Sequence, residues 1–562
     1  MIRNTIAELT RNAILTAQAA KALPAFEIPP VEITRPPRAD MGDYSSALPL
    51  KLASVARRAP LQIAQTIAQF MPSDLALGKI ETVAPGYINF TLAPAWVAGQ
   101  VARIREAGAR FGDVNLGNGQ RMQVEHTSAN PTGPLTVGSA RNMALGDTLA
   151  RILGAAGYRI ETEYYVNDAG SQVRHLGESI YARYAQQLGR DEPFPEEGYK
   201  GEYVNDIARA ILERDGDKYL AMPKDEAIRI LKRLGVEMMS AANKETLARV
   251  RVVFDNWFSE ESLRTSGLLD EVLQKLASLN LTYIKDDALW FKATEFGLEK
   301  DAVLVRSAKI VPEADERPTY LASDLAYMWN KLVLRGYDRA IYVWGADHQG
   351  DVPRVMAAAR ALGIDPARIT IIVYQLVRLT RGGERVRMSK RSGEFDTLED
   401  LIHDVGADAV RFLLITSSAD AAMDFDLQLA VQQSNENPVY YVQYAHARIA
   451  SILRNAADAG IHPEGANLGL LSHPAELELI KQMLKLEEVV EYAALKLEPH
   501  HLPHYAIDLA ASFHQFYKQC RVLSSDPADA EISKTRLALV TATKQVLARS
   551  LDLMGVSAPD AM

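Results

Sequence analysis

The sequence predicts a multidomain α/β protein whose central part is a doubly wound parallel sheet. Between about residues 116 and 400, short apolar runs alternate with helical patterns, and this alternation indicates right-handed βαβ units. Residues 1–115 combine helical and strand-like pieces, whereas residues 401–562 show helical periodicity throughout. We therefore expect a small α+β domain, a central α/β domain and an all-α domain, in that order.

The N-terminal domain is expected to open with an amphipathic helix. Charged and apolar side chains alternate at helical spacing over residues 1–26, a pattern that differs from a signal peptide. A further helix is expected at 61–70, and strands are expected at 79–82 and 87–92.

The central domain is expected to contain six strands of one parallel sheet. Its alternation is interrupted between about residues 173 and 281, where the pattern is almost entirely helical and predicts an insertion between two halves of the sheet. The expected strands are 120–126, 159–165, 288–291, 302–305, 340–344 and 369–376. The helices expected in the C-terminal domain include 438–456, 474–497 and 533–553, which predict bundle-like packing.

Composition narrows the class of protein. The chain has a single cysteine, Cys520, which excludes an intramolecular disulfide and a cysteine-type zinc site. No apolar stretch reaches the length of a membrane span, so we expect a cytoplasmic protein. The formal net charge of −9 gives no global sign of nucleic-acid binding, but a basic patch on an acidic protein could still bind RNA.

One segment, VEHTSANPTGPLTVGSARN at 124–142, has the pattern of an anion-binding cradle. Its first half reads as a strand that ends in a loop rich in proline and glycine, and a helix is expected to begin at about Gly138. Free backbone N–H groups point outward at such a helix start and favour phosphate. Glu125 and Asn130 flank this cradle on one side, and Arg141 flanks it on the other.

A second segment, RLTRGGERVRMSKRSG at 378–393, places many cations in a glycine-containing loop. Such a loop could close over a departing pyrophosphate. Alone, it would be interpreted as an exposed basic hairpin tip. Its pairing with the cradle favours a nucleotide site.

Together the two segments resemble the motifs of class I aminoacyl-tRNA synthetases, in which 136–139 corresponds to the HIGH motif and 387–391 to the KMSKS motif. Within that class the resemblance is to arginyl-tRNA synthetases and extends over the whole chain. The other segments that carry it are RPPRADMGDYSSALPLKLA, IETVAPGYINF, YLASDLAY, WGADHQGDVPR, NPVYYVQYAHARIASILR and the closing MGVSAPDAM. A cysteinyl synthetase is disfavoured because the chain lacks the cysteines for a substrate-sensing zinc.

The resemblance implies a Rossmann-like catalytic domain at 116–400, an N-terminal domain at 1–115 that contacts tRNA, and a helical linker and anticodon-binding domain at 401–562. The implied enzyme is an arginine–tRNA ligase. It would activate L-arginine with ATP to arginyl-adenylate and transfer the arginine to the terminal ribose of tRNA(Arg). Mg²⁺ is expected on the ATP phosphates rather than in a protein cage. We expect no zinc, no membrane partner and a monomer.

An arginine pocket needs carboxylates that meet a guanidinium. Tyr320 and Asp324 lie one helical turn apart, so both would face the substrate, although Ser323 and Asp324 could instead cap a helix over 325–334. The resemblance implies arginine-binding roles for Glu125, Asn130, Tyr320, Asp324 and His348. It implies ATP-binding roles for Pro131, Thr136, Gly138, Ser139, Gly345, Asp347, Met388 and Lys390, and catalytic roles for Lys390, Ser389, Arg391, Thr136 and Ser139.

Thr136 and Ser139 stand where the family motif carries two histidines. Hydroxyls also donate hydrogen bonds, but they carry no charge, and charge-assisted bonds contribute about 1.5–3 kcal/mol against about 1 for neutral ones. Three interpretations follow. The chain is an active synthetase in which the hydroxyls, the helix start, Arg141 and the basic loop compensate; or it is a weakened paralogue that binds tRNA or arginine; or it is another nucleotidyl transferase. The first is favoured because Lys390 and the pocket carboxylates are retained.

Overall fold

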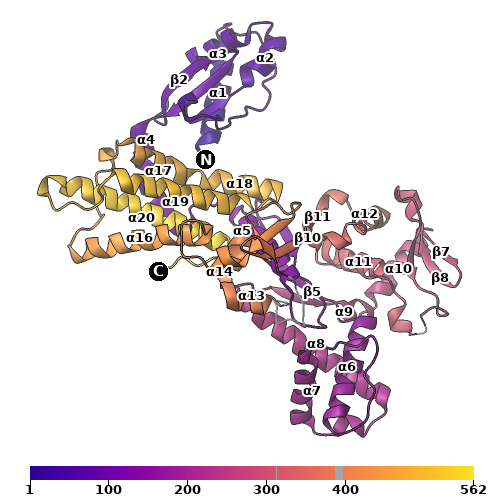
Figure 1. Ribbon diagram of the computed structural model, residues 1–562. Helices are drawn as coiled ribbons and strands as arrows, with labels where there is room; N and C mark the ends of the chain where they lie inside the picture. Colours follow the sequence, from indigo (N-terminus) through magenta and orange to yellow (C-terminus); the bar gives the residue numbers. More distant parts are fainter. Residues whose placement is uncertain (312, 387–396) are drawn as a thin grey trace.

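The computed structural model describes residues 1–311, 313–386 and 397–562 (Figure 1). The N-terminal domain lies against the side of the C-terminal helices, and the α/β domain adjoins one end of those helices. Within the described ranges, no helix combines the length and the apolar character that crossing a membrane would require.

The N-terminal domain has the expected α+β composition. Its three strands form an antiparallel sheet in the order β1-β3-β2, and α1 and α3 bury apolar faces that include Ile6, Ile14 and Ile67. Pro60 at the first position of α3 suits a helix start, where its missing N–H leaves no bond unmade. The elements are α1 (Ile2–Ala19), β1 (Tyr44–Ser46), α2 (Leu48–Ala56), α3 (Pro60–Gln69), β2 (Leu77–Val83), β3 (Tyr87–Leu92) and the connecting α4 (Pro94–Ala107).

The central domain is built on a five-stranded parallel sheet in the order β11-β10-β4-β5-β6. If the five strands are numbered along the chain and read from the β6 edge, the order is 3-2-1-4-5. This is a doubly wound arrangement, in which ligands bind where the strand order reverses. The reversal lies between β4 and β10. The sheet strands and crossover helices are β4 (Arg121–Glu125), α5 (Val137–Ala155), β5 (Arg159–Val166), β6 (Asn256–Ser259), β10 (Arg339–Gly345), α12 (Val352–Ala361) and β11 (Ile369–Tyr374).

Four of the six strands expected in the parallel sheet are confirmed. The other two form strands, but in a different sheet. Residues 288–291 and 302–305 do form strands, but they belong with β7 (Thr282–Lys285) to a separate antiparallel sheet, as β8 (Ala288–Phe291) and β9 (Ala302–Val305). Only Asp286 and Asp287 connect β7 to β8, both at positive φ (53° and 58°). Such a two-residue turn closes a hairpin, whereas a parallel pair needs a long crossover.

The expected helical insertion is correct at its start and wrong at its end. Three long helices follow β5 and share their own apolar core, which includes Leu176, Tyr184 and Leu231. The chain then returns to the parallel sheet as β6, inside the stretch expected to be helical. Its four residues are too short and too evenly half-buried to give a period-2 signal. The helices are α6 (Ser171–Gln187), α7 (Glu202–Asp215) and α8 (Lys224–Arg249), and after β6 come α9 (Glu260–Thr265) and α10 (Leu268–Ser278).

The C-terminal region is mostly helical, as expected, with one exception. β14 (Met423–Asp426) pairs in parallel with β12 (Val377–Arg381), which also pairs with β13 (Glu384–Arg385). The helices are α13 (Leu398–Val405), α14 (Ala407–Leu414), α15 (Leu427–Val431), α16 (Pro438–Asp458), α17 (Pro474–Leu484), α18 (Leu486–Lys496), α19 (His501–Gln519) and α20 (Ala530–Leu553).

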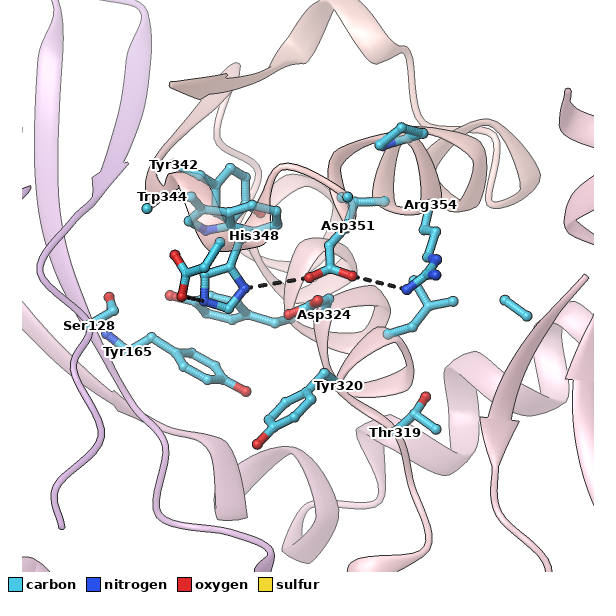
Figure 2. Close-up of a pocket in the computed structure, with 18 of the residues that line it drawn as sticks. Ser128, Tyr165, Thr319, Tyr320, Asp324, Tyr342, Trp344, His348, Asp351 and Arg354 are labelled. Atoms are coloured by element: carbon cyan, nitrogen blue, oxygen red, sulfur yellow. Dashed lines mark hydrogen bonds and ion pairs between the residues drawn. The ribbon is translucent and has the colours of Figure 1, made fainter. Parts of the chain in front are cut away.

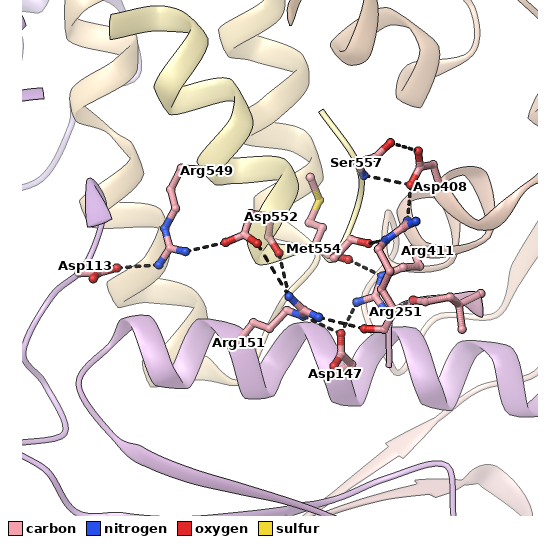
Figure 3. A network of polar contacts seen from close by, with 12 residues as sticks. Asp113, Asp147, Arg151, Arg251, Asp408, Arg411, Arg549, Asp552, Met554 and Ser557 are labelled. Atoms are coloured by element: carbon pink, nitrogen blue, oxygen red, sulfur yellow. Dashed lines mark hydrogen bonds and ion pairs between the residues drawn. The ribbon is translucent and has the colours of Figure 1, made fainter. Parts of the chain in front are cut away.

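Polar contacts join the domains. Arg35 donates to both carboxylate oxygens of Glu488 on α18, at 2.8 and 3.0 Å, and Tyr44 donates to the same carboxylate. On the other side of the helical region, Arg411 of α14 pairs with Asp147 of α5 and reaches the C-terminal segment (Figure 3). These contacts connect α5, the helix that begins at the predicted nucleotide cradle, to α14 and to the C-terminal segment.

Candidate active site

A cavity of about 1080 Å³ lies at the carboxyl ends of β4 and β10, where the strand order reverses. This is the position at which open α/β sheets bind ligands. Side chains of β5 and of α11 (Tyr320–Trp329) also line it, as do residues between 298 and 306. Seven of the predicted site residues line this cavity: Glu125, Asn130, Tyr320, Asp324, Gly345, Asp347 and His348.

Tyr320 and Asp324 project into the cavity from successive turns of α11 (Figure 2). The helix begins at Tyr320 with Thr319 as its N-cap, so the alternative in which Asp324 caps a later helix is wrong. Ser323 points away from the cavity wall and donates to Glu260 at 2.8 Å. The first turn of α11 therefore delivers one aromatic ring and one carboxylate to the same space.

Asp324 has an unusual electrostatic environment. Burial, followed by the nearby carboxylates of Glu125 and Glu260, raises its pKa to about 8. In the part of the chain that the structure describes, Asp324 forms no ion pair of its own. A carboxylate in this state gains most from a ligand that brings a positive charge.

Glu125 is the last residue of β4 and is almost fully buried. Its carboxylate accepts a hydrogen bond from the ammonium of Lys331 at 2.5 Å. Lys331 lies in the π-helical turn Asn330–Leu334 that continues α11. Glu125 and Asp324 thus differ, because Glu125 is already paired within the protein and Asp324, among the described residues, is not.

The turn after β4 is strained. Thr127 and Ser128 have φ values of 69° and 31°, which non-glycine residues rarely adopt. Asn142 of α5 holds this turn, because its side chain accepts from the Thr127 N–H at 2.7 Å and donates to the Val343 carbonyl at 2.9 Å. Asn130 follows on the exposed side of the turn and donates to Gln172 at 2.6 Å. The strain orients the segment that runs from Glu125 to Asn130 along the cavity.

Gly345 ends β10 and is half-buried, and the exposed Asp347 and His348 follow it; all three line the cavity. His348 lies between two carboxylates, with Nε2 at 3.7 Å from Asp347 and Nδ1 at 3.5 Å from Asp351 (Figure 2). A side chain added at Gly345 would meet the Asp347 carboxylate at 2.5 Å. A larger residue here would therefore displace the exposed Asp347 side chain.

The predicted cradle forms the N-terminus of α5, a helix of 19 residues. Thr136 is its N-cap, and its hydroxyl lies 3.5 Å from that of Ser139. Pro131 is buried in the preceding loop, whereas Gly138 is exposed. These four residues do not line the cavity itself, but Tyr374, which does, donates to the Gly138 carbonyl at 3.4 Å. The helix start and the cavity are neighbouring parts of one site.

Arg141 does not serve the predicted role of compensating at the phosphates. Its side chain is fully buried, and its guanidinium donates to the carbonyls of Gln375, Ala421 and Ser418 at 2.6–2.8 Å. These bonds hold the guanidinium in the interior, where it cannot reach a phosphate at the exposed start of α5. Arg141 instead fixes the first turn of α5 against two segments of the later chain.

Met388, Ser389, Lys390 and Arg391 lie outside the described residues. The structure describes the residues on either side of this segment, up to 386 and from 397. β12 and β13 form a hairpin that ends at Arg385, and Thr397 forms an antiparallel bridge with Thr136. The Leu398 N–H also donates to the Leu135 carbonyl at 2.7 Å. The chain thus re-enters the described structure beside the start of α5.

Several residues of the site were missed by the sequence interpretation. Tyr327 and Lys331 continue the stripe of Tyr320 and Asp324 at helical spacing, and that periodicity was the signal that could have found them. Tyr165 gave no such signal. Its hydroxyl is buried beside the cavity, and among the described residues it has no hydrogen-bond partner.

One group of side chains in the described ranges has the composition of a metal site. Glu498, His500 and His501 offer ligand atoms within 4.8 Å of one another, in the connection between α18 and α19. None of the three lines the cavity.

Comparisons with known proteins cover all three domains. Residues 4–92 match the family model "Arginyl tRNA synthetase N terminal domain", residues 100–450 match "tRNA synthetases class I (R), catalytic domain", and residues 442–562 match "DALR anticodon binding domain". The chain is 45% identical over 561 residues to the arginine–tRNA ligase of Dehalococcoides mccartyi strain CBDB1, covering 100% of this chain and 99% of that protein. It is 45% identical over 568 residues to the arginine–tRNA ligase of Heliobacterium modesticaldum, with the same coverage.

Solved structures agree with these matches. The putative arginyl-tRNA synthetase of Campylobacter jejuni superimposes with a TM-score of 0.75 at 31% identity, covering 84% of this chain and 100% of that one. The arginyl-tRNA synthetase of Thermus thermophilus superimposes with a TM-score of 0.73 at 25% identity, covering 100% of both chains. By sequence, domain order and fold, the chain belongs to the arginyl-tRNA synthetase family of class I aminoacyl-tRNA synthetases.

Proposed function

We propose that the chain is an arginine–tRNA ligase. It activates L-arginine with ATP, supplied as its Mg²⁺ complex, to arginyl-adenylate and pyrophosphate, and then transfers the arginine to the 3′-terminal ribose of tRNA(Arg). The observation that carries this proposal is the half-buried Asp324 beside Tyr320, which has no ion pair among the described residues and lies in a cavity that adjoins the N-terminus of α5. A guanidinium and a triphosphate are the two ligands that these features favour.

The arginine side of the site is proposed to lie over α11 and the end of β4. Asp324 would accept hydrogen bonds from the guanidinium, and the exposed ring of Tyr320 would pack on it. Asn130 and His348 lie toward the solvent side of the cavity, where they could hold the α-amino and carboxylate groups. Glu125 contributes from the floor at the end of β4.

The ATP side is proposed to extend from the Gly345–Asp347 turn to the start of α5. The backbone N–H of Gly138, with the hydroxyls of Thr136 and Ser139, would donate to the phosphates. Pro131 shapes the loop before this helix. Met388, Ser389, Lys390 and Arg391 are assigned to ATP binding and catalysis by family resemblance.

The tRNA is proposed to contact both outer domains, 1–115 and 401–562. In the helical domain, Tyr440 and Tyr444 stack with ring centroids 5.9 Å apart, and Arg448 lies 4.7 Å from the Tyr444 ring. Partly exposed aromatic rings beside a guanidinium suit the stacking of unpaired bases. We propose that the enzyme acts as a monomer in the cytoplasm.

The test is aminoacylation of purified tRNA(Arg) with radiolabelled arginine, in parallel with arginine-dependent ATP–pyrophosphate exchange with and without tRNA. We expect charging that requires ATP, Mg²⁺ and active protein. Retained tRNA binding without charging under any Mg²⁺ or tRNA condition would favour the weakened paralogue instead. No feature of the described residues favours that alternative.

A further inference from the structure

A lysine is enclosed behind the wall of the arginine pocket. Lys331 is 0% exposed, and it is not one of the residues that line the cavity. Its ammonium lies 2.5 Å from a Glu125 oxygen, 3.8 Å from the centre of the Tyr327 ring and 4.0 Å from the centre of the Tyr342 ring. All three of these partners do line the cavity. Lys331 therefore contacts the pocket wall from its rear side only.

Enclosing an ammonium is costly, because burial removes its hydration. The partners of Lys331 offset that cost with one carboxylate and two aromatic faces, which attract cations. Lys331 also lies in the π-helical turn Asn330–Leu334, where the Arg335 N–H donates to the Asn330 carbonyl. Such turns are rare and recur at functional sites.

The charges of the pocket are distributed unequally. Lys331 compensates Glu125 from behind, so this carboxylate carries its counter-ion whether or not a substrate is present. Asp324 lies on the same side of the helix as Lys331 and has no ion pair within the described residues. The neighbouring Glu163 receives hydrogen bonds from Tyr327 and from Arg335, and is compensated within the wall. Of Glu125, Glu163 and Asp324, only Asp324 has no counter-ion among the described residues and is left for the ligand.

We propose that Lys331 is a positioning residue that holds Glu125, so that of the two carboxylates beside it in the lined wall, Glu125 and Asp324, only Asp324 meets a cationic side chain without a counter-ion of its own. This inference rests on the proposed function, since it assigns how that same pocket distinguishes its amino acid. Through Tyr327 and Tyr342, Lys331 also fixes the two aromatic surfaces that flank Glu125. The residue acts on the substrate only through these partners.

A purely structural lysine would behave differently from a positioning one. If Lys331 merely fills space, its replacement lowers stability and affects arginine and ATP alike. If it holds Glu125, its replacement by the apolar, similarly long methionine leaves a buried carboxylate without a counter-ion beside the substrate. The arginine site is then disturbed, while the ATP site at the start of α5 is preserved.

The experiment compares wild type, Lys331→Met, Glu125→Gln and the double variant, with calorimetric binding of arginine and of ATP and the KM of each in pyrophosphate exchange. We expect Lys331→Met to weaken arginine binding by at least about tenfold and to change ATP binding by less than about threefold. The double variant removes the unpaired charge and should recover part of the lost arginine affinity. The matched control is Lys485→Met, which removes a half-buried lysine of the helical domain that donates to Gln482.

Three outcomes overturn the inference: arginine binding by Lys331→Met that equals wild type, equal weakening of arginine and ATP, or a double variant whose losses are the sum of the single ones. Should Lys331→Met fail to fold, the double variant, which has no uncompensated charge, is compared with Glu125→Gln alone. In that comparison equal arginine affinities support the inference, and a further loss contradicts it. Charging of tRNA(Arg) by wild type is measured alongside, since its absence would instead contradict the proposed function.

Discussion

Asp147 and Arg411 form an ion pair in the interior of the protein, between α5 and α14 (Figure 3). Arg411 also donates to the Met554 carbonyl at 2.7 Å and to the Val250 carbonyl at 2.8 Å. Burial alone would raise the pKa of Asp147, but the guanidiniums of Arg411 and Arg151 hold it below its ordinary value. One buried guanidinium thus joins the cradle helix, the end of α8 and the C-terminal segment.

Replacing Arg411 by methionine should lower the free energy of unfolding by about 3–5 kcal/mol, because Asp147 and two carbonyls would lose a buried donor. Urea denaturation followed by circular dichroism measures the change. Arg209→Met is the control, since Arg209 pairs with Asp206 on the surface and should change stability by no more than about 1 kcal/mol. Equal effects of the two substitutions would contradict the importance of the buried pair.

Arginine should bind more tightly as the pH rises toward 8. The pKa of Asp324 in the free protein is raised to about 8 by burial and neighbouring carboxylates, so at lower pH the guanidinium must displace a proton. The dissociation constant should fall by about tenfold for each pH unit between about pH 6 and 8. Calorimetry in buffers of different ionisation enthalpy would detect the released proton. Asp324→Asn should bind weakly and lose this slope; a flat wild-type profile would refute the assignment.

Lys390→Ala should slow arginine activation by more than about tenfold, since the family resemblance assigns this lysine to charge stabilisation on the phosphates. Pyrophosphate exchange at saturating arginine and ATP measures the rate. Lys79→Ala, on β2 of the N-terminal domain, serves as the control and should leave the rate unchanged. An unchanged rate in Lys390→Ala would mean that the basic segment is only a surface tip.

Thr136→Ala combined with Ser139→Ala should slow activation by about tenfold or more, because both hydroxyls lie at the start of α5 and would donate to the phosphates. The burial of Arg141 strengthens this expectation, as its guanidinium is occupied elsewhere. The matched control is Thr66→Ala, which removes a half-buried threonine of α3 whose hydroxyl donates to the Gln62 carbonyl. Introducing histidine at both positions is the converse experiment, and a slower rate there would show that the site is adapted to hydroxyls.

Sequence patterns predicted the parts of the fold that repeat regularly. The strands that became β4, β5, β10 and β11 were found because apolar runs and crossover helices recur at long range. β6 and β14 are four residues each and have too few positions for a period to emerge. The antiparallel pairing of β7 and β8 depends on a two-residue turn. This local signal does not belong to the βαβ pattern from which the strands were assigned to one parallel sheet.

In the candidate site, too, some residues could be predicted from local sequence patterns and others could not. Tyr320 and Asp324 share a helical turn, so their convergence could be predicted from spacing alone. Arg141 lies beside the cradle in sequence, but its direction is decided by carbonyls near residues 375 and 420, which no local pattern reveals. Lys331 continues the helical stripe of Tyr320 and Asp324, but a lysine on a helix is ordinarily solvated, and its enclosure is seen only in the folded chain.

The stripe on α11 has a consequence for how this region can vary. Tyr320, Asp324, Tyr327 and Lys331 recur at spacings that keep them on one side of a helix, and together they supply the pocket and its rear wall. A substitution at one of them changes one contact. An insertion or deletion of a single residue within 320–331 would rotate the following positions by about 100° and misalign several contacts at once. The length of α11 is therefore as strict a requirement as the identity of its side chains.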